Sequence, residues 1–162
     1  MKCKNLLTSL PLIAAVLYNP MASAVDTKVY NGSYCKPYFG SQSADLHHRY
    51  DGILNVSNNS RYITCPVLHD QAFVPQGAKI YVRYVAGSSG GTLSCTVYSL
   101  NSNGGIVASA TGSTNQSGWL PPDNGQQPQP ALVIGSDDAS YNMFCSLPAG
   151  GRVSAIQVDE ND

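Results

Sequence analysis

The fold is decided by two stretches of the chain, Thr92–Leu100 (TLSCTVYSL) and Tyr141–Leu147 (YNMFCSL). Both alternate apolar and polar residues with a period of two, which is the side-chain period of a β-strand. Each stretch places one cysteine, Cys95 or Cys145, among its apolar residues. The pattern predicts two strands whose cysteines form a buried cross-link between neighbouring or facing strands.

The rest of the chain also has the features of short β-strands. No window has a convincing helical period of 3.6 residues, and turn signals recur about every 8–12 residues. Eight or nine short strands of this kind predict an all-β fold, an antiparallel β-sandwich of the Ig-like or jelly-roll type. Besides the two stretches above, we expect strands at Gly52–Ser57, Arg61–Leu68, Lys79–Ala86, Ile106–Thr111, Ala131–Ile134 and Arg152–Val158, with a short edge strand at Gln71–Val74.

The connections are predicted from glycine, asparagine and proline. Asn58-Asn59 suits a tight turn because asparagine tolerates left-handed backbone angles, and Gly87–Gly91 and Asn101–Gly105 suit hairpins. Gly40–Tyr50 is polar and irregular, with room for one helical turn. Gly112–Pro130 has no periodicity and predicts a long loop, and loops of that length in compact domains are usually functional or disordered.

The first residues have the features of a targeting segment. Lys2 and Lys4 precede the apolar run Leu6–Leu17, and Met21–Ala24 ends in small residues. About 12 apolar residues are too few for a bilayer that needs about 20, which argues against a membrane anchor. We therefore expect a signal peptide at residues 1–24, cleavage after Ala24, and a single exported domain at residues 25–162, extracellular or periplasmic and not attached to a membrane.

Four cysteines remain after that cleavage: Cys35, Cys65, Cys95 and Cys145. An even number in an exported chain implies two disulfides, for which three connectivities are possible. The spacing has no CxxC pair and does not fit a zinc site. We prefer pairing between sequence neighbours, Cys35 with Cys65 and Cys95 with Cys145.

Charge excludes one class of partner. The chain has 9 basic and 10 acidic residues, and two of the basic ones, Lys2 and Lys4, leave with the signal peptide. No basic patch is present, which argues against nucleic acid or anionic lipid as a partner.

Motifs for catalysis or metal binding are weak. Gly87–Gly91 formally matches G-x-S-x-G, but a nucleophile elbow needs a helix after it, and a strand is predicted there. Asp45, His47, His48 and Asp51 lie in one polar segment and are candidate metal ligands, although a solvated loop is the interpretation we favour. Glu160 is the single glutamate, so paired-glutamate chemistry is not expected. We expect no catalytic residue and no cofactor.

Trp119 is the candidate for ligand binding. An exposed tryptophan flanked by Asn115 and Gln116 would stack on a sugar ring while the two amides bond its hydroxyl groups. The alternative is that the Trp119 ring is buried and anchors the long loop. Several tyrosines expected on outer faces, Tyr62, Tyr81 and Tyr98, either extend a binding surface or form ordinary cross-strand pairs.

Four short motifs carry a resemblance: TCPV (Thr64–Val67), SCTVYS (Ser94–Ser99), CSLPAG (Cys145–Gly150) and QVDE (Gln157–Glu160). Together they resemble small exported bacterial proteins that share the TCP and CSLP cysteine motifs and have no known activity. The resemblance implies a bacterial, exported, disulfide-bonded domain, and it carries over no functional residue.

The sequence therefore predicts a secreted, disulfide-bonded β-sandwich that serves as a binding or structural module and recognises an extracellular glycan or protein. Two other hypotheses stay open. One is a small secreted hydrolase with an unrecognised site. The other is a subunit of a surface fibre, joined through unpaired edge strands.

Overall fold

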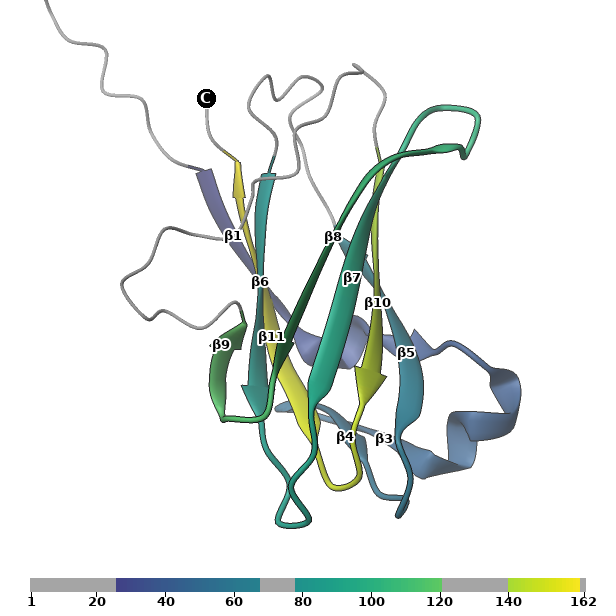
Figure 1. The fold of residues 1–162 in the computed structure, drawn as a ribbon, viewed down its shortest axis with the longest axis vertical. Helices are drawn as coiled ribbons and strands as arrows, with labels where there is room; N and C mark the ends of the chain where they lie inside the picture. Colours follow the sequence, from purple (N-terminus) through teal and green to yellow (C-terminus); the bar gives the residue numbers. More distant parts are fainter. Residues whose placement is uncertain (1–25, 68–77, 121–139, 161–162) are drawn as a thin grey trace, which may run out of the picture.

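Two antiparallel sheets face each other in a computed structural model that describes residues 26–67, 78–120 and 140–160 (Figure 1). The predicted all-β sandwich is confirmed. The segments predicted as strands at Gln71–Val74 and Ala131–Ile134, and the predicted signal peptide, lie outside the described residues.

One sheet has six strands in the order β3-β4-β11-β6-β9, with β1 also paired to β11. Its strands are β1 (Asp26–Asn31), β3 (Leu46–Arg49), β4 (Gly52–Asn55), β6 (Ala78–Val85), β9 (Gly118–Leu120) and β11 (Arg152–Glu160). The other sheet has five strands in the order β2-β5-β10-β7-β8. Its strands are β2 (Lys36–Pro37), β5 (Arg61–Val67), β7 (Leu93–Leu100), β8 (Ile106–Thr114) and β10 (Ser140–Leu147). Two short 3-10 helices, η1 (Gly32–Tyr34) and η2 (Gly40–Asp45), lie near β2 in the sequence.

The core lies between the sheets and follows the alternation read from the sequence. In β7 every second residue from Leu93 is buried, and in β10 the buried positions are Tyr141, Met143, Cys145 and Leu147. The six-stranded sheet contributes the opposite wall, with Ile53, Val82, Tyr84, Leu120, Val153, Ile156 and Val158. Burial raises the pKa of the Tyr84 phenol, because the apolar surroundings disfavour the phenolate.

Both disulfides pair as predicted, Cys35 with Cys65 and Cys95 with Cys145. Cys95 and Cys145 are directly opposite each other in β7 and β10, with their Cα atoms 4.1 Å apart. Cys35 precedes β2, which pairs with β5, the strand that carries Cys65. The Cys95–Cys145 bond therefore joins two neighbouring strands of the five-stranded sheet, the Cys35–Cys65 bond joins the residue before β2 to β5 of that sheet, and neither bond joins the two sheets.

Two predicted connections differ in the structure. Asn58-Asn59, predicted as a tight turn with left-handed backbone angles, connects β4 of one sheet to β5 of the other, and no non-glycine residue of the described ranges has a positive φ. The predicted hairpin at Gly87–Gly91 is wrong, because this segment joins β6 of one sheet to β7 of the other. The predicted hairpin at Asn101–Gly105 is confirmed, because it joins the neighbouring strands β7 and β8.

A buried asparagine fixes the first of these crossings. The Nδ2 group of Asn55 donates to the carbonyl of Asn59 at 2.8 Å and to that of Leu147 at 2.9 Å. Its Oδ1 atom accepts from the backbone N–H and the hydroxyl of Ser57. Every polar atom of this side chain is bonded, as a fully buried amide requires. Asn55 thereby ties the end of β4 to the turn before β5 and to the end of β10.

Two segments predicted as irregular contain strands. β3 lies within Gly40–Tyr50; it buries Leu46 alone, so it shows no alternation in the sequence. Within the predicted loop at Gly112–Pro130, β8 continues to Thr114 and β9 follows at Gly118–Leu120. The end of β8 consists of small residues that bury little apolar surface. Its position therefore depends on backbone pairing with β7.

Candidate functional site

Four aromatic side chains meet on the outer face of the five-stranded sheet. This aromatic cluster consists of Tyr38, Phe39, Tyr62 and Phe144. The rings of Tyr62 and Phe144 are stacked, with centroids 5.3 Å apart and planes 15° apart. Tyr38 packs edge-on against Phe144 at 4.9 Å, and Phe39 packs edge-on against Tyr62 at 5.8 Å. The exposed fractions of Tyr38, Phe39 and Tyr62 are 55%, 46% and 36%, so these rings form one contiguous patch that solvent reaches.

Hydrogen bonds along the edge of β5 position this cluster. The N–H of Tyr38 donates to the carbonyl of Tyr62 at 2.9 Å, which continues the pairing of β2 with β5. The N–H of Tyr62 donates to Oε1 of Gln42 in η2, also at 2.9 Å. Asp45, at the end of η2, accepts from Nε of Arg61 at 2.7 Å. These three contacts attach the segment that carries Tyr38 and Phe39 to the strand that carries Tyr62.

A broad polar surface continues from the cluster across β10, β7 and β8. Thr64 donates its hydroxyl to Oδ1 of Asn142 at 2.8 Å, and the hydroxyls of Thr96 and Thr111 are hydrogen-bonded at 2.8 Å. The strand register aligns these outward residues in rows across the sheet. They are Thr64 and Pro66 of β5, Asn142 and Ser146 of β10, Ser94, Thr96 and Tyr98 of β7, and Ser109, Thr111 and Ser113 of β8.

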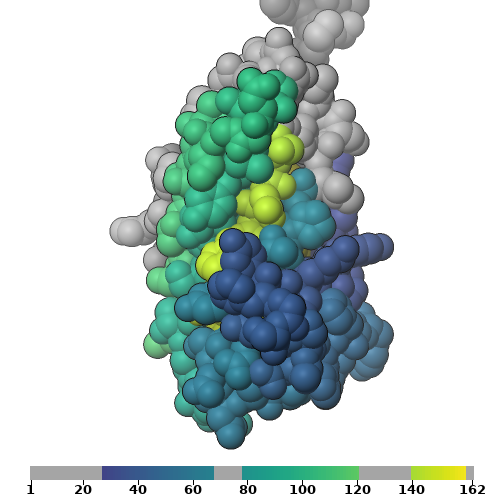
Figure 2. Space-filling model, turned by 90° about the vertical axis from the view of Figure 1, so that its right-hand side faces the viewer, coloured from purple at the N-terminus to yellow at the C-terminus, as the bar shows by residue number. Residues whose placement is uncertain are grey.

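None of these outward residues is charged, and the charged residues in the described strands of this sheet are Lys36 of β2 and Arg61 of β5, of which Arg61 is paired with Asp45. Figure 2 shows this side of the molecule, with the yellow-green side chains of β10 exposed between the green residues on the left and the blue N-terminal residues. The outer face of the six-stranded sheet differs, because its outward positions include Lys79, Arg83, Arg152 and Asp159. The two outer faces of the sandwich are therefore chemically distinct.

The predicted ligand residues lie elsewhere. Asn115 and Gln116 are exposed in the turn between β8 and β9. Trp119 lies in β9 opposite Arg83 of β6, and it is half-buried. Because its neighbour Leu120 is buried in the core, the Trp119 side chain lies on the outer face of the six-stranded sheet. Trp119 is thus neither at an exposed loop tip nor in the core, and the aromatic cluster is on the opposite side of the sandwich.

The candidate metal ligands do not converge. Asp45 is bonded to Arg61, and Asp51 is paired with Arg152. His47 and His48 are exposed in the edge strand β3, where Nδ1 of His48 is 3.0 Å from the carbonyl oxygen of Ser33. Within the described ranges, no three His, Cys, Asp or Glu side chains are grouped closely enough to hold a metal ion.

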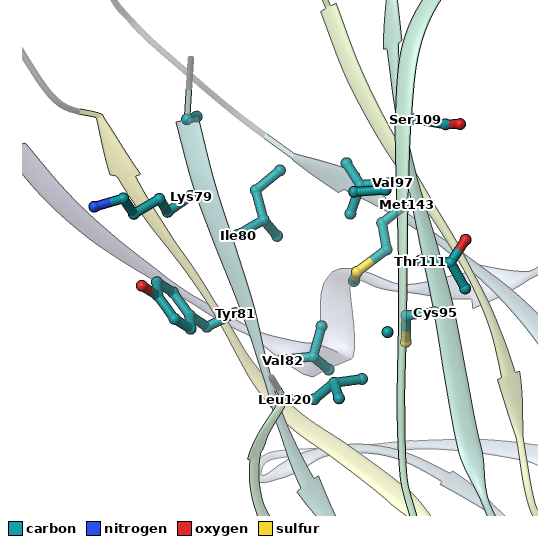
Figure 3. A pocket seen from close by; sticks show the side chains of 13 residues that line it. Lys79, Ile80, Tyr81, Val82, Cys95, Val97, Ser109, Thr111, Leu120 and Met143 are labelled. Carbon is teal, nitrogen blue, oxygen red and sulfur yellow. The ribbon is translucent and has the colours of Figure 1, made fainter. Parts of the chain in front are cut away.

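The sandwich also contains an apolar cavity between β6 and β8, with a volume of about 150 Å³. Ile80, Val82, Val97, Leu120 and Met143 surround it (Figure 3). In the same view Lys79 and Tyr81 point away from the cavity on one side, and Ser109 and Thr111 on the other. The cavity exists because the inward residues of β8 at this level are Ala110 and Gly112, which are too small to fill the space.

Sequence reasoning missed most of the aromatic cluster. It placed Tyr62 on an outer face, but it did not single out Tyr38, Phe39 or Phe144. One signal was present: Phe144 occupies an outward position of a strand whose other outward residues are polar, and a large apolar residue there needs an explanation. The proximity of Tyr38 and Phe39 to Phe144 depends on β2 pairing with β5, which no local pattern shows.

No protein-family model matches the sequence, and no curated protein matches it. Two solved structures are similar to this chain in fold. One is described as a xylan-binding module CBM15; it is 7% identical with a TM-score of 0.43, over 85% of this chain and 97% of that chain. The other is the Family 11 Carbohydrate-Binding Module of cellulosomal cellulase Lic26A-Cel5E of Clostridium thermocellum. It is 12% identical with a TM-score of 0.34, over 86% of this chain and 88% of that chain.

None of the helices in the described ranges is both long enough and apolar enough to cross a membrane.

Proposed function

We propose that this protein is a secreted glycan-binding module and that its site is the outer face of the five-stranded sheet, centred on the aromatic cluster. The observation that carries the proposal is the exposure of Tyr38, Phe39 and Tyr62 beside rows of uncharged hydroxyl and amide groups. Exposed large apolar groups that gather in one patch usually mark an interaction surface, whereas single ones need no explanation.

The chemistry of this surface fits a neutral sugar. An aromatic ring offers a flat apolar face on which the C–H groups of a pyranose ring can stack. Hydroxyl groups donate and accept hydrogen bonds, and the Asn142 amide does both, so the neighbouring rows match the hydroxyls of a sugar. A charged ligand would find no group of opposite charge in the rows of β10, β7 and β8.

The two disulfides support a site of action outside the cytoplasm. Disulfides form and persist in oxidising compartments, and small secreted domains rely on them. A glycan of a cell surface or an extracellular polysaccharide is the ligand that such a protein would meet there.

The test is a screen of the purified protein against immobilised neutral and acidic polysaccharides, followed by affinity measurement on the best ligand. Tyr62→Ala should weaken binding at least about tenfold, because aromatic residues at the centre of a site carry much of its binding energy. Tyr38→Ala should weaken it as well. Tyr38→Ala should lower the melting temperature little, since that ring is 55% exposed, and a melting curve checks that Tyr62→Ala, whose ring is 36% exposed and stacked on Phe144, remains folded.

Tyr50→Ala is the matched control. Tyr50 is 94% exposed and lies in the turn between β3 and β4, outside the cluster. Its backbone carbonyl, which accepts from Asn31, is unaffected by the substitution. Equal affinity of the Tyr62→Ala variant and the wild type, or an equal loss in the Tyr50→Ala variant, would refute the proposed site.

A further inference from the structure

The free edge of β8 is the least protected strand edge in the described part of the chain. β8 pairs with β7 on one side, and no described strand pairs with it on the other. Its sequence, IVASATGST, has nine residues, no charge and no proline. Natural edge strands are normally short, charged, interrupted by proline or covered, because an open edge accepts further strands.

The other edge strands of the described ranges follow that rule. β1, which pairs only with β11 there, carries Lys28. β2 has two residues, one of which is Pro37, and β9 has three residues. β3 has four residues and carries His47, His48 and Arg49. The contrast within one fold singles out β8.

The register shows which backbone groups of β8 face outward. The Cα atoms of Cys95 and Cys145 are 4.1 Å apart, which is the spacing of a non-hydrogen-bonded antiparallel pair. Cys95 therefore turns its N–H and C=O towards β8, where its partner is Gly112. Because the direction alternates along an antiparallel strand, the groups that face the free edge are those of Ser109, Thr111 and Ser113.

The apolar cavity opens beside this same stretch. Its wall on the β8 side is formed by the four residues from Ser109 to Gly112. A strand added to the edge would run along the cavity, and alternate side chains of that strand would point inward. A cavity of about 150 Å³ can hold a group the size of benzene, so one leucine or phenylalanine side chain fits.

We propose that β8 is a strand-addition site for another polypeptide. The occupant is an extended, uncharged segment that bonds to the free backbone groups of β8 and inserts one apolar side chain into the cavity between β6 and β8. This mode of recognition takes its affinity from main-chain hydrogen bonds and its specificity from pockets for alternate side chains. β8 carries no charge, and Lys79, the charged residue that lines the cavity, points its side chain away from it, so this edge favours a neutral segment. The site is separate from the aromatic cluster.

The probe is a synthetic peptide of alternating threonine and leucine, with a peptide of the same composition in block order as its control. We expect the wild-type protein to bind the alternating peptide, which should slow amide hydrogen exchange at Ser109, Thr111 and Ser113. The amides of Ala110 and Gly112 already face β7 and should change little. This pattern distinguishes strand addition from binding of the peptide elsewhere.

Two variants test the cavity and the free backbone edge of β8 one at a time. Ala110→Leu fills the cavity from the β8 side, and Thr111→Pro removes a free-edge N–H that β7 does not use; each should weaken peptide binding about tenfold or more. Melting curves check that each variant folds. If Thr111→Pro does not fold, Ala110→Leu and the wild-type exchange pattern decide the question.

Tyr62→Ala is the control for the other site and should bind the peptide as the wild type does, while Ala110→Leu should keep its polysaccharide binding. Three results would each overturn the proposal: no binding of the alternating peptide by the wild type, no protection of the three edge amides, or undiminished binding by Ala110→Leu.

Discussion

Trp119 and Leu120 are adjacent residues of β9 whose side chains lie on opposite faces of the six-stranded sheet. Leu120 is buried and lines the cavity, whereas Trp119 is half-buried on the outer face beside Arg83. Trp119→Ala should therefore cost about 1–2 kcal/mol of unfolding free energy, less than the 3–5 kcal/mol typical of a fully buried tryptophan. Leu120→Ala should cost about 2–5 kcal/mol. Urea unfolding of the two variants measures both values.

The same variants test the recognition role predicted for Trp119. If Trp119→Ala costs as much as Leu120→Ala, the ring is an anchor of β9. If Trp119→Ala abolishes polysaccharide binding and Tyr62→Ala does not, the ligand binds at the six-stranded face, and the aromatic cluster is not the site.

Individual residues were predictable where two constraints coincided. Cys95 and Cys145 were identified because alternation and cysteine chemistry point to the same inward face, and the pairing is confirmed. Phe144 has no such support, because its role depends on Tyr38, a residue more than a hundred positions away in the chain. Contacts between sequence-distant residues on an outer face leave no periodic signal.

Among the elements, strands with a buried face on every second residue were predictable, and short or small-residue strands were not. β6, β7 and β10 bury alternate positions and stand out in the sequence. β3 and β9 each bury one residue, so their position depends on backbone pairing with β4 and β6. The sequence also did not predict which sheet a strand joins, because a turn such as that at Asn58-Asn59 can either close a hairpin or cross between sheets.

Each disulfide links two segments of the five-stranded sheet, and its removal tests how much that link stabilises the folded protein. They close loops with sequence separations of 30 and 50 residues. Replacing both cysteines of a pair by alanine should lower the free energy of unfolding by about 3–4 kcal/mol, slightly more for Cys95 and Cys145, because a longer loop loses more entropy when it is closed. Urea unfolding of each double variant measures the cost. A loss below about 1 kcal/mol for either pair would show that the cross-link adds little to strands already held by the sheet.

At the scale of the whole molecule, the sandwich presents two outer faces of different charge. The five-stranded face carries the aromatic cluster and uncharged rows, and the six-stranded face carries Lys79, Arg83, Arg152 and Asp159. The apolar cavity lies between them and opens beside β8. The aromatic cluster and the free edge of β8 lie apart on the five-stranded sheet, with β10 and β7 between β5 and β8, although the side chains of Ser109, Thr111 and Ser113 belong to the uncharged rows and their backbone groups to the free edge.

The difference in charge between the two outer faces predicts how ligand binding responds to salt. Salt screens charge–charge attraction, with a Debye length of about 30 Å at 0.01 M and about 3 Å at 1 M, but it hardly affects stacking and neutral hydrogen bonds. A neutral polysaccharide held by the aromatic cluster should therefore bind with nearly the same affinity across this range. Titrations at the two salt concentrations, with the Tyr62→Ala and Trp119→Ala variants in parallel, make the comparison. An affinity that falls steeply with salt, and is sensitive to Trp119 rather than Tyr62, would place the ligand on the charged six-stranded face.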